Sequence, residues 1–199
     1  MEESFATRKL LQTNELKNLN KKSDLFGFLQ LGSHVSAILL LVYAHTLALG
    51  SWWVIITGTL LGIVINFLYA GQHELSHWTV FKTKYLNELF GRMIGLIMLF
   101  PRDYDQVMHF AHHRWTQDWK RDGELTRAPY TLGRYLLWMS GITYWRNRLI
   151  GIIRRARGII IEPYIGATHE CKIIGESRWH LVIYGLIFLI SLYLESWAA

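Results

Sequence analysis

The chain has 199 residues, of which 51% are hydrophobic and 14% aromatic, and its mean hydropathy is positive. This length suits one domain, and a soluble domain of this length is seldom so apolar. The formal net charge of +6 alone would allow a nucleic-acid partner, but residues 25–73 contain no Lys, Arg, Asp or Glu. This distribution of charge is typical of a membrane protein and argues against nucleic-acid binding.

The first 24 residues are polar and contain no apolar stretch followed by a cleavage site, which argues against a secretory signal. We expect residues 1–24 to form a cytosolic tail and residues 25–199 to form one membrane domain. The single cysteine, Cys171, excludes an internal disulfide.

The uncharged stretch is too long for one membrane span, and Gly50 and Ser51 favour a turn within it. It therefore predicts two helices, Leu25–Leu49 and Trp52–His73, each longer than about 20 residues. At 1.5 Å per residue each helix is about 33 Å long, which is enough to cross a hydrocarbon core of about 30 Å. We expect a tight transmembrane hairpin.

The positively charged residues indicate which end of the hairpin is cytosolic. Lys and Arg occur in the N-terminal tail and between Lys82 and Arg178, whereas the hairpin turn carries none. Positive residues accumulate on the cytosolic side of membrane proteins. We therefore expect the tail and the long middle region on the cytosolic side and the turn near Gly50 on the opposite side.

Three apolar segments follow the hairpin. Leu86–Phe100 is too short for a span and contains Arg92, which favours an interfacial or re-entrant helix. Residues 130–158 mix aromatic, aliphatic and arginine residues and predict one or two helices on the membrane surface. Trp179–Leu194 predicts a third transmembrane helix, near the lower limit of length and truncated by the end of the chain. The expected fold is therefore an all-α integral membrane protein.

Five of the nine histidines fall into two groups, His73 and His77 in HELSH and His109, His112 and His113 in HFAHH. Residues three and four apart lie on one face of a helix, so each group presents its imidazoles in one direction. Imidazole binds Fe, Zn, Cu or Ni, and five imidazoles are too many for one zinc ion. If the two helices meet, the groups form a site for two metal ions; otherwise they are scattered surface histidines.

HELSH also matches H-E-x-x-H, the zinc-protease pattern in which two histidines bind zinc and the glutamate is the general base. In that alternative Glu74 is the base, Glu88 or another downstream acid supplies a third ligand, and HFAHH has no role. In an iron site, Glu74 would instead orient a ligand or face water. A membrane protein without catalytic activity is the remaining alternative.

HELSH, the short apolar segment after it and HFAHHRWTQDWKRDGEL together resemble the membrane fatty acid desaturase family, which includes membrane alkane and carotenoid hydroxylases. The family's first histidine box, H-x(3,4)-H, is matched by His73 and His77. Its second box, H-x(2,3)-H-H, is matched by His109, His112 and His113. The resemblance implies that these five histidines hold two irons on the cytosolic face, where O2 is activated and hydrogen is removed from an acyl chain.

The resemblance also implies the reaction and the partners. The expected reaction introduces a double bond into an acyl chain, and hydroxylation by a member of the same superfamily is the alternative. The expected partners are an acyl-lipid substrate, O2 and an electron donor of the ferredoxin or cytochrome b5 type. Basic residues around Lys82, Lys120 and Arg121 would dock the donor or a substrate head group, or else are ordinary cytosolic charges.

The sequence departs from the family pattern in one respect. The family has a third box, with another His-His pair, after two further spans, and this chain has no such box. We therefore expect the chain to be the N-terminal part of a desaturase-like enzyme, with an incomplete set of iron ligands and little activity alone.

Two acidic residues near the second box are expected to hold ligating histidines. A histidine that binds a metal usually donates its other N–H to a carboxylate or carbonyl. Asp105, one turn before His109, and Asp122 are the candidates, unless they belong to a solvated loop. His34 and His45 are expected to be polar packing residues.

Overall fold

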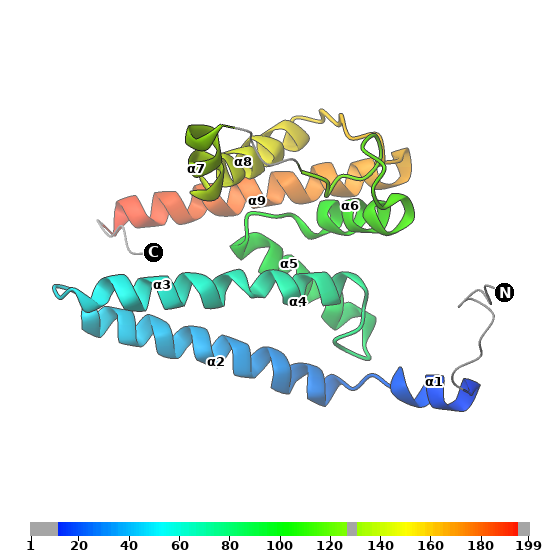
Figure 1. Ribbon diagram of the computed structural model, residues 1–199, viewed down its shortest axis with the longest axis horizontal. Coiled ribbons are helices and arrows are strands. Elements are labelled where there is room, and N and C mark those ends of the chain that lie inside the picture. Colours follow the sequence, from blue (N-terminus) through cyan, green and yellow to red (C-terminus); the bar gives the residue numbers. More distant parts are fainter. Residues whose placement is uncertain (1–11, 127–130, 195–199) are drawn as a thin grey trace.

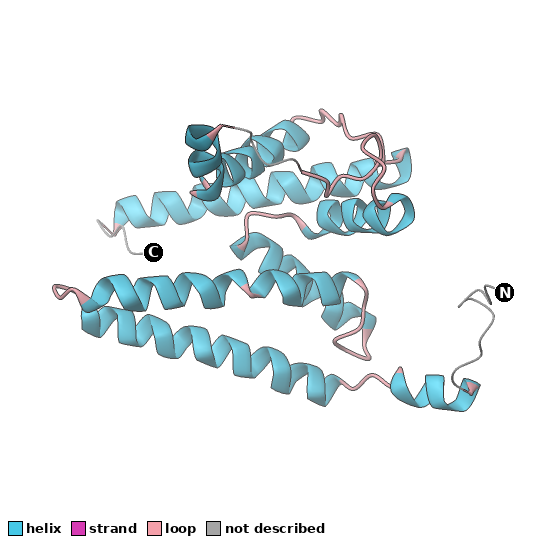
Figure 2. Cartoon of the chain, viewed as in Figure 1, coloured by secondary structure: helices cyan, strands magenta, loops and turns pink. Residues whose placement is uncertain are grey.

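The computed structural model describes residues 12–126 and 131–194, which are helical and contain no β-strand (Figure 2). Nine helices, α1–α9, follow one another within these ranges. Their bounds are Thr13–Leu19 (α1), Asp24–Ala48 (α2), Trp53–Asn66 (α3), Leu68–Ser76 (α4), Lys84–Ile97 (α5), Arg102–Trp115 (α6), Leu132–Met139 (α7), Ile142–Ala156 (α8) and Ala167–Tyr193 (α9). The predicted all-helical fold is confirmed. Residues 1–11 of the expected tail lie outside the described residues.

Three segments of the described chain are helical, long and apolar enough to span a membrane. They are α2 with 25 residues, Trp53–Ser76 with 24 residues and α9 with 27 residues. The second of these combines α3 and α4, which are separated by a break at Phe67. The predicted hairpin followed by a third membrane-spanning helix is thus confirmed.

The two helices of the hairpin lie side by side (Figure 1). Gly50 in the turn has a φ of 82°, in the left-handed region that glycine adopts without a steric cost. His34 Nε2 donates to the carbonyl oxygen of Val64 at 3.0 Å, and His45 Nδ1 lies 3.0 Å from Thr57 Oγ1. Both histidines join α2 to α3, which agrees with the polar packing role expected of them.

The third spanning helix begins earlier than the apolar run indicates. α9 starts at Ala167, whereas we expected an apolar helix from Trp179. The first part of α9 carries Glu170, Lys172 and Glu176 and packs against α6 and α8. The hydropathy of the sequence therefore identified only the apolar C-terminal part of this helix. The start predicted at Trp179 was wrong.

The shorter helices agree with the expected interfacial segments. α5 covers most of the predicted Leu86–Phe100 segment. α7 and α8 lie within residues 130–158 and are separated by Gly141, whose φ is 73°. Both expose large apolar side chains, among them Leu136 and Ile142. Such surfaces fit the predicted contact with the membrane surface.

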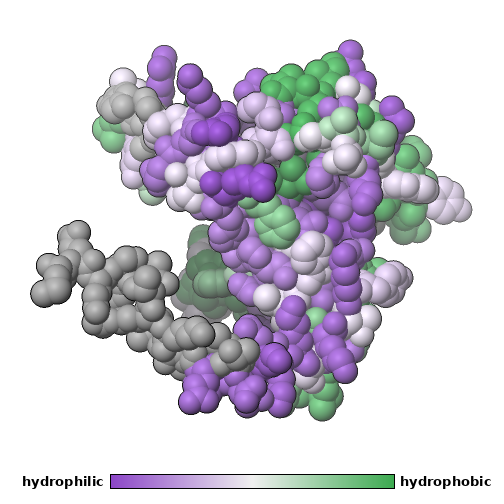
Figure 3. Space-filling view, turned by 90° about the vertical axis from the view of Figure 1, so that its right-hand side faces the viewer, coloured by the Kyte–Doolittle hydropathy of each residue, from purple (hydrophilic) through white to green (hydrophobic). Residues whose placement is uncertain are grey.

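The ends of α4 and α6 and the start of α9 gather at one end of the molecule, opposite to the hairpin turn (Figure 1). This end is viewed in Figure 3 and is largely hydrophilic. Beneath it, one cluster of buried side chains includes residues of α4, α5, α6 and α9, among them Leu75, Ile94, Met108 and Ile173. This core fixes α4 and α6, the helices that carry the two histidine groups.

Candidate metal centre

The two histidine groups lie near the ends of two adjacent helices. α4 ends at Ser76, with His77 as its C-cap, and α6 carries the second group in its C-terminal half. Two amide side chains connect these helices. Gln72 Nε2 donates to Asp105 Oδ2 at 2.9 Å, and Gln106 Nε2 donates to the carbonyl oxygen of Ser76 at 2.6 Å. The helices therefore meet, as a shared site requires.

Four imidazole rings form one cluster. The ring centroid of His109 lies 4.1 Å from that of His73, 4.8 Å from that of His77 and 4.5 Å from that of His113. The Nε2 atoms of His77, His109 and His113 lie 2.8–3.2 Å from one another. The structure thus brings four of the five predicted ligands together, with His109 at the centre.

His112 stands beside this cluster. Its ring centroid is 6.3 Å from that of His109 and 6.0 Å from that of His113. Its Nδ1 donates to Asp122 at 2.9 Å, and its Nε2 lies 4.0 Å from Glu124 Oε2. The fifth predicted ligand is therefore adjacent, but its Nε2 does not converge with the other three.

Carboxylates fix the protonation of two rings. His109 Nδ1 lies 2.8 Å from Glu124 Oε1, and His112 Nδ1 lies 2.9 Å from Asp122 Oδ2. An ionised carboxylate only accepts hydrogen bonds, so each Nδ1 carries the proton. In a neutral ring the Nε2 atom then carries a lone pair, which is the form that binds a metal.

The three converging Nε2 atoms are better suited to binding a cation than to hydrogen bonding with one another. A ring nitrogen offers either one N–H or one lone pair, so three mutual contacts cannot all be good hydrogen bonds. A metal ion among them would be bound by all the lone pairs at once. His73, His77 and His109 also offer ligand atoms within 4.8 Å of one another. Such an all-imidazole donor set suits iron or zinc.

The two predicted acidic partners differ in what they contact. Asp122 binds His112, as expected, whereas Asp105 binds Gln72 and, at 3.5 Å, the hydroxyl of Tyr69. Asp105 was selected for its helical spacing from the second box, but it has no hydrogen bond to a box histidine among the described residues. Glu124, the partner of His109, was missed because no helical periodicity relates it to the box.

A strained loop positions these acids. Gln117, just after α6, has a φ of 70°, which is uncommon for a residue other than glycine. Its backbone N–H donates to Asp122 Oδ2 at 3.1 Å, and the N–H of Glu124 donates to Asp122 Oδ1 at 3.0 Å. The loop thereby turns back and brings both carboxylates to the histidines of α6.

Burial changes the acidity of several groups at the centre. It lowers the pKa of His77 and of His109, and the neighbouring histidines lower the pKa of His77 further. Burial raises the pKa of Asp105 to about 6. Burial also raises the pKa of Asp122, but hydrogen bonds from His112 and from two backbone N–H groups outweigh it and leave this pKa low. The centre therefore favours neutral imidazoles beside an ionised Asp122.

The acids of the zinc-protease alternative lie elsewhere. Glu74 is exposed and accepts a hydrogen bond from the Thr79 hydroxyl at 2.7 Å. Glu88 pairs with Lys84 at 3.9 Å. A protease base must reach water bound to the metal, whereas the Glu74 carboxylate is engaged by the Thr79 side chain and Glu88 by Lys84. This arrangement disfavours the protease.

His169 and His180 lie outside the cluster. His180 is 3% exposed, and its Nδ1 lies 3.1 Å from the hydroxyl of Tyr184, which donates to the carbonyl oxygen of Leu96. It is therefore a packed residue between α9 and α5. His169 is exposed and contacts Thr168.

The chain was compared with protein families, with curated proteins and with solved structures. The family model described as fatty acid desaturase matches residues 50–199, which include both histidine groups. The curated proteins and the solved structures gave no significant match. The family match covers more than half of the chain. The chain therefore belongs to the fatty acid desaturase family.

Proposed function

We propose that this protein is an iron-dependent membrane oxidoreductase that uses O2 to introduce a double bond into an acyl chain. Membership of the fatty acid desaturase family supports the reaction class. The observation that supports the proposal most directly is the convergence of three Nε2 atoms from the two histidine groups. Hydroxylation of the same kind of substrate is the alternative reaction.

The five box histidines would hold two iron ions. His109 belongs to the centre of the cluster, and Glu124 and Asp122 keep protons on Nδ1 of their histidine partners. The Nε2 atoms are thereby left free for metal. Bound iron would supply the O2-dependent oxidation that breaks an unactivated C–H bond. Five imidazoles leave coordination positions open on two ions, so we expect this chain to hold iron weakly.

The expected surroundings of the centre follow from its position. The polar end of the molecule would face the cytosol, where an electron donor of the ferredoxin or cytochrome b5 type can reach it. The acyl chain would enter from the bilayer. The membrane domain at residues 25–199 would then place a cytosolic metal centre beside a lipid-borne substrate.

Turnover with defined substrates tests the proposal. The purified protein is loaded with ferrous iron and supplied with reductant, O2 and an acyl lipid, and the products are analysed by mass spectrometry. Because the set of iron ligands is incomplete, we expect only slow loss of two hydrogens, which His109→Ala abolishes and Glu74→Gln leaves intact. O2-independent peptide cleavage that Glu74→Gln abolishes would support the zinc protease instead, and product formation by His109→Ala would contradict the proposal.

A further inference from the structure

A cavity of about 490 Å³ lies beside the metal centre, between α6 and α8. Its volume is in the range of small-molecule sites, roughly 300–1,000 Å³. One wall contains Glu124, which binds His109 Nδ1, and Met108, the residue before His109. Glu124 therefore borders both the cavity and the histidine cluster.

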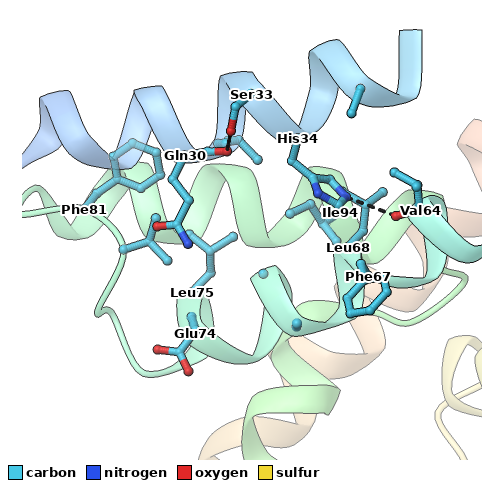
Figure 4. Close-up of a pocket in the computed structure, with 15 residues that line it drawn as sticks. Gln30, Ser33, His34, Val64, Phe67, Leu68, Glu74, Leu75, Phe81 and Ile94 are labelled. Atoms are coloured by element: carbon cyan, nitrogen blue, oxygen red, sulfur yellow. Dashed lines mark hydrogen bonds between the residues drawn. The ribbon is translucent and has the colours of Figure 1, made fainter. Parts of the chain in front are cut away.

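A second cavity, of about 610 Å³, is less well placed. It lies between α2, α4 and α5, and Figure 4 shows Gln30, His34 and Leu75 around it. Neither a box histidine nor a carboxylate that binds one is part of its wall. An occupant of this cavity would be separated from the metal centre by α4.

The cavity between α6 and α8 contains a cation without a carboxylate partner. The Arg148 guanidinium lies 3.6 Å above the ring of Phe100 and donates to the Tyr144 hydroxyl and, at 3.1 Å, to the carbonyl oxygen of Met98. In the part of the chain that the structure describes, no acidic oxygen lies within ion-pair distance of it. Arg155 in the same wall is different, because it pairs with Glu162 at 3.2 Å.

A half-buried guanidinium without an ion-pair partner is a site for an anion, and here Asp105 attracts Arg148 electrostatically but lies beyond ion-pair distance. Partial burial of a charge costs free energy that a bound counter-charge can offset. Two neutral oxygens occupy only part of the five N–H donors of Arg148. The planar guanidinium matches a carboxylate or a phosphate group, and aromatic side chains such as Tyr69 and Trp138 provide the apolar remainder of the wall.

We propose that Arg148 binds the oxyanion end group, a carboxylate or a phosphate, of an acyl compound in this cavity. If that compound is the substrate, an assumption that rests on the proposed function, then the carbon atom that is oxidised lies near the charged end of the substrate. The chain beyond the oxidised carbon would then leave the cavity toward the bilayer. Such a substrate is recognised by its charged end group, and not only by apolar contacts to its hydrocarbon chain.

Equilibrium binding to the full chain in detergent tests the proposal without turnover. The probes are a long-chain fatty acid, an alkyl phosphate of the same length and the neutral methyl ester. We expect the acid or the phosphate to bind at least about tenfold more tightly than the ester. Arg148→Gln should abolish this preference without weakening ester binding, and Arg146→Gln, an exposed arginine of the same helix, should preserve it.

The position of the bound compound is tested with a photoreactive group. A fatty acid that carries a diazirine beside the carboxylate should label Met108, Glu124 or Tyr69, whereas a diazirine at the methyl end should not. Equal affinity for acid, phosphate and ester, or a preference that survives in Arg148→Gln, would overturn the proposal. Because these readouts require neither iron nor catalysis, a failure of the proposed function would be seen separately, as absence of turnover with normal binding.

Discussion

At the scale of single residues, Glu124 determines which nitrogen of His109 can bind a metal. Its carboxylate lies 2.8 Å from Nδ1 and so leaves the lone pair on Nε2. Glutamine at this position accepts a weaker hydrogen bond and can also present its N–H₂ group. We expect Glu124→Gln to lower the affinity for iron about 10–100-fold.

Competition with a chelator measures this change. Glu88→Gln is the matched control, because Glu88 pairs with Lys84 on the surface of α5. The same affinity for iron in wild type and Glu124→Gln would show that this carboxylate does not control the ring.

Asp105 should make stability depend on pH. Burial raises its pKa to about 6, from an unfolded value near 3.9. The folded state therefore binds this proton more tightly, so the contribution of Asp105 to stability is fully present below about pH 4 and is lost as the pH rises through about 6. Asp105→Asn removes this titration. Between pH 4 and 7 we expect the variant to lose less stability than wild type, by on the order of 2 kcal/mol.

Thermal unfolding of metal-free protein in detergent measures the effect of Asp105→Asn. Removing the metal keeps the pH dependence of metal binding out of the comparison. Parallel pH profiles for wild type and variant would contradict the assigned pKa.

The sequence identified the histidines of the centre more completely than their partners. Helical spacing was enough to place His73 and His77 on one face, and His109 and His113 on another. Glu124 reaches His109 through a loop in which Gln117 adopts a positive φ. Asp122 and Glu124 belong to this same loop, and without periodicity the sequence could not show which of the two faces which histidine.

At the scale of elements, α6 depends on a carboxylate from α9. Glu176 Oε1 accepts from the N–H of Arg102 at 3.1 Å, and Oε2 accepts from the N–H of Asp103 at 2.7 Å. Arg92 of α5 lies 3.3 Å from the same carboxylate. The first N–H groups of a helix lack partners within it, so Glu176 stabilises the helix that carries the second histidine group.

Glu176→Ala should therefore destabilise α6. One buried and one partly buried N–H group lose their acceptor, and we expect a cost of about 1–3 kcal/mol. Hydrogen exchange of the first turn of α6 should accelerate, while Glu170→Ala, earlier on α9, should leave it unchanged. Unchanged exchange in Glu176→Ala would mean that Pro101 and the local packing suffice to start the helix.

The structural role of α9 also explains the error in its predicted start. A hydropathy scan favours Trp179, because the preceding residues include Glu176 and Arg178. Those polar residues bind α6 and α8, and Arg178 Nε donates to the carbonyl oxygen of Ala156 at 2.9 Å. Tertiary contacts of this kind extend a helix beyond its apolar run. The first helix of the hairpin is apolar over almost its whole length, and it was predicted to within one residue at each end.

At the scale of the whole molecule, the distribution of Lys and Arg predicts the orientation in the membrane. The histidine cluster lies at the polar end, opposite to the hairpin turn (Figures 1 and 3). We propose that this end faces the cytosol. In a Cys171→Ser background, we expect an impermeant maleimide to label Ser51→Cys in intact cells and Lys120→Cys only after permeabilisation. Labelling in the reverse order would invert the orientation.

The central claim is that both histidine groups bind iron together, and metal analysis tests it most directly. Wild type, His109→Ala and His45→Ala are purified and equilibrated with the same concentrations of free ferrous iron and zinc, because this chain is expected to hold iron weakly, and the iron and zinc bound at equilibrium are measured. His45 bonds to Thr57 within the hairpin and is the control. The account predicts iron in wild type and His45→Ala and its loss, by at least about tenfold, in His109→Ala. Zinc in place of iron, or equal iron in all three proteins, would contradict it.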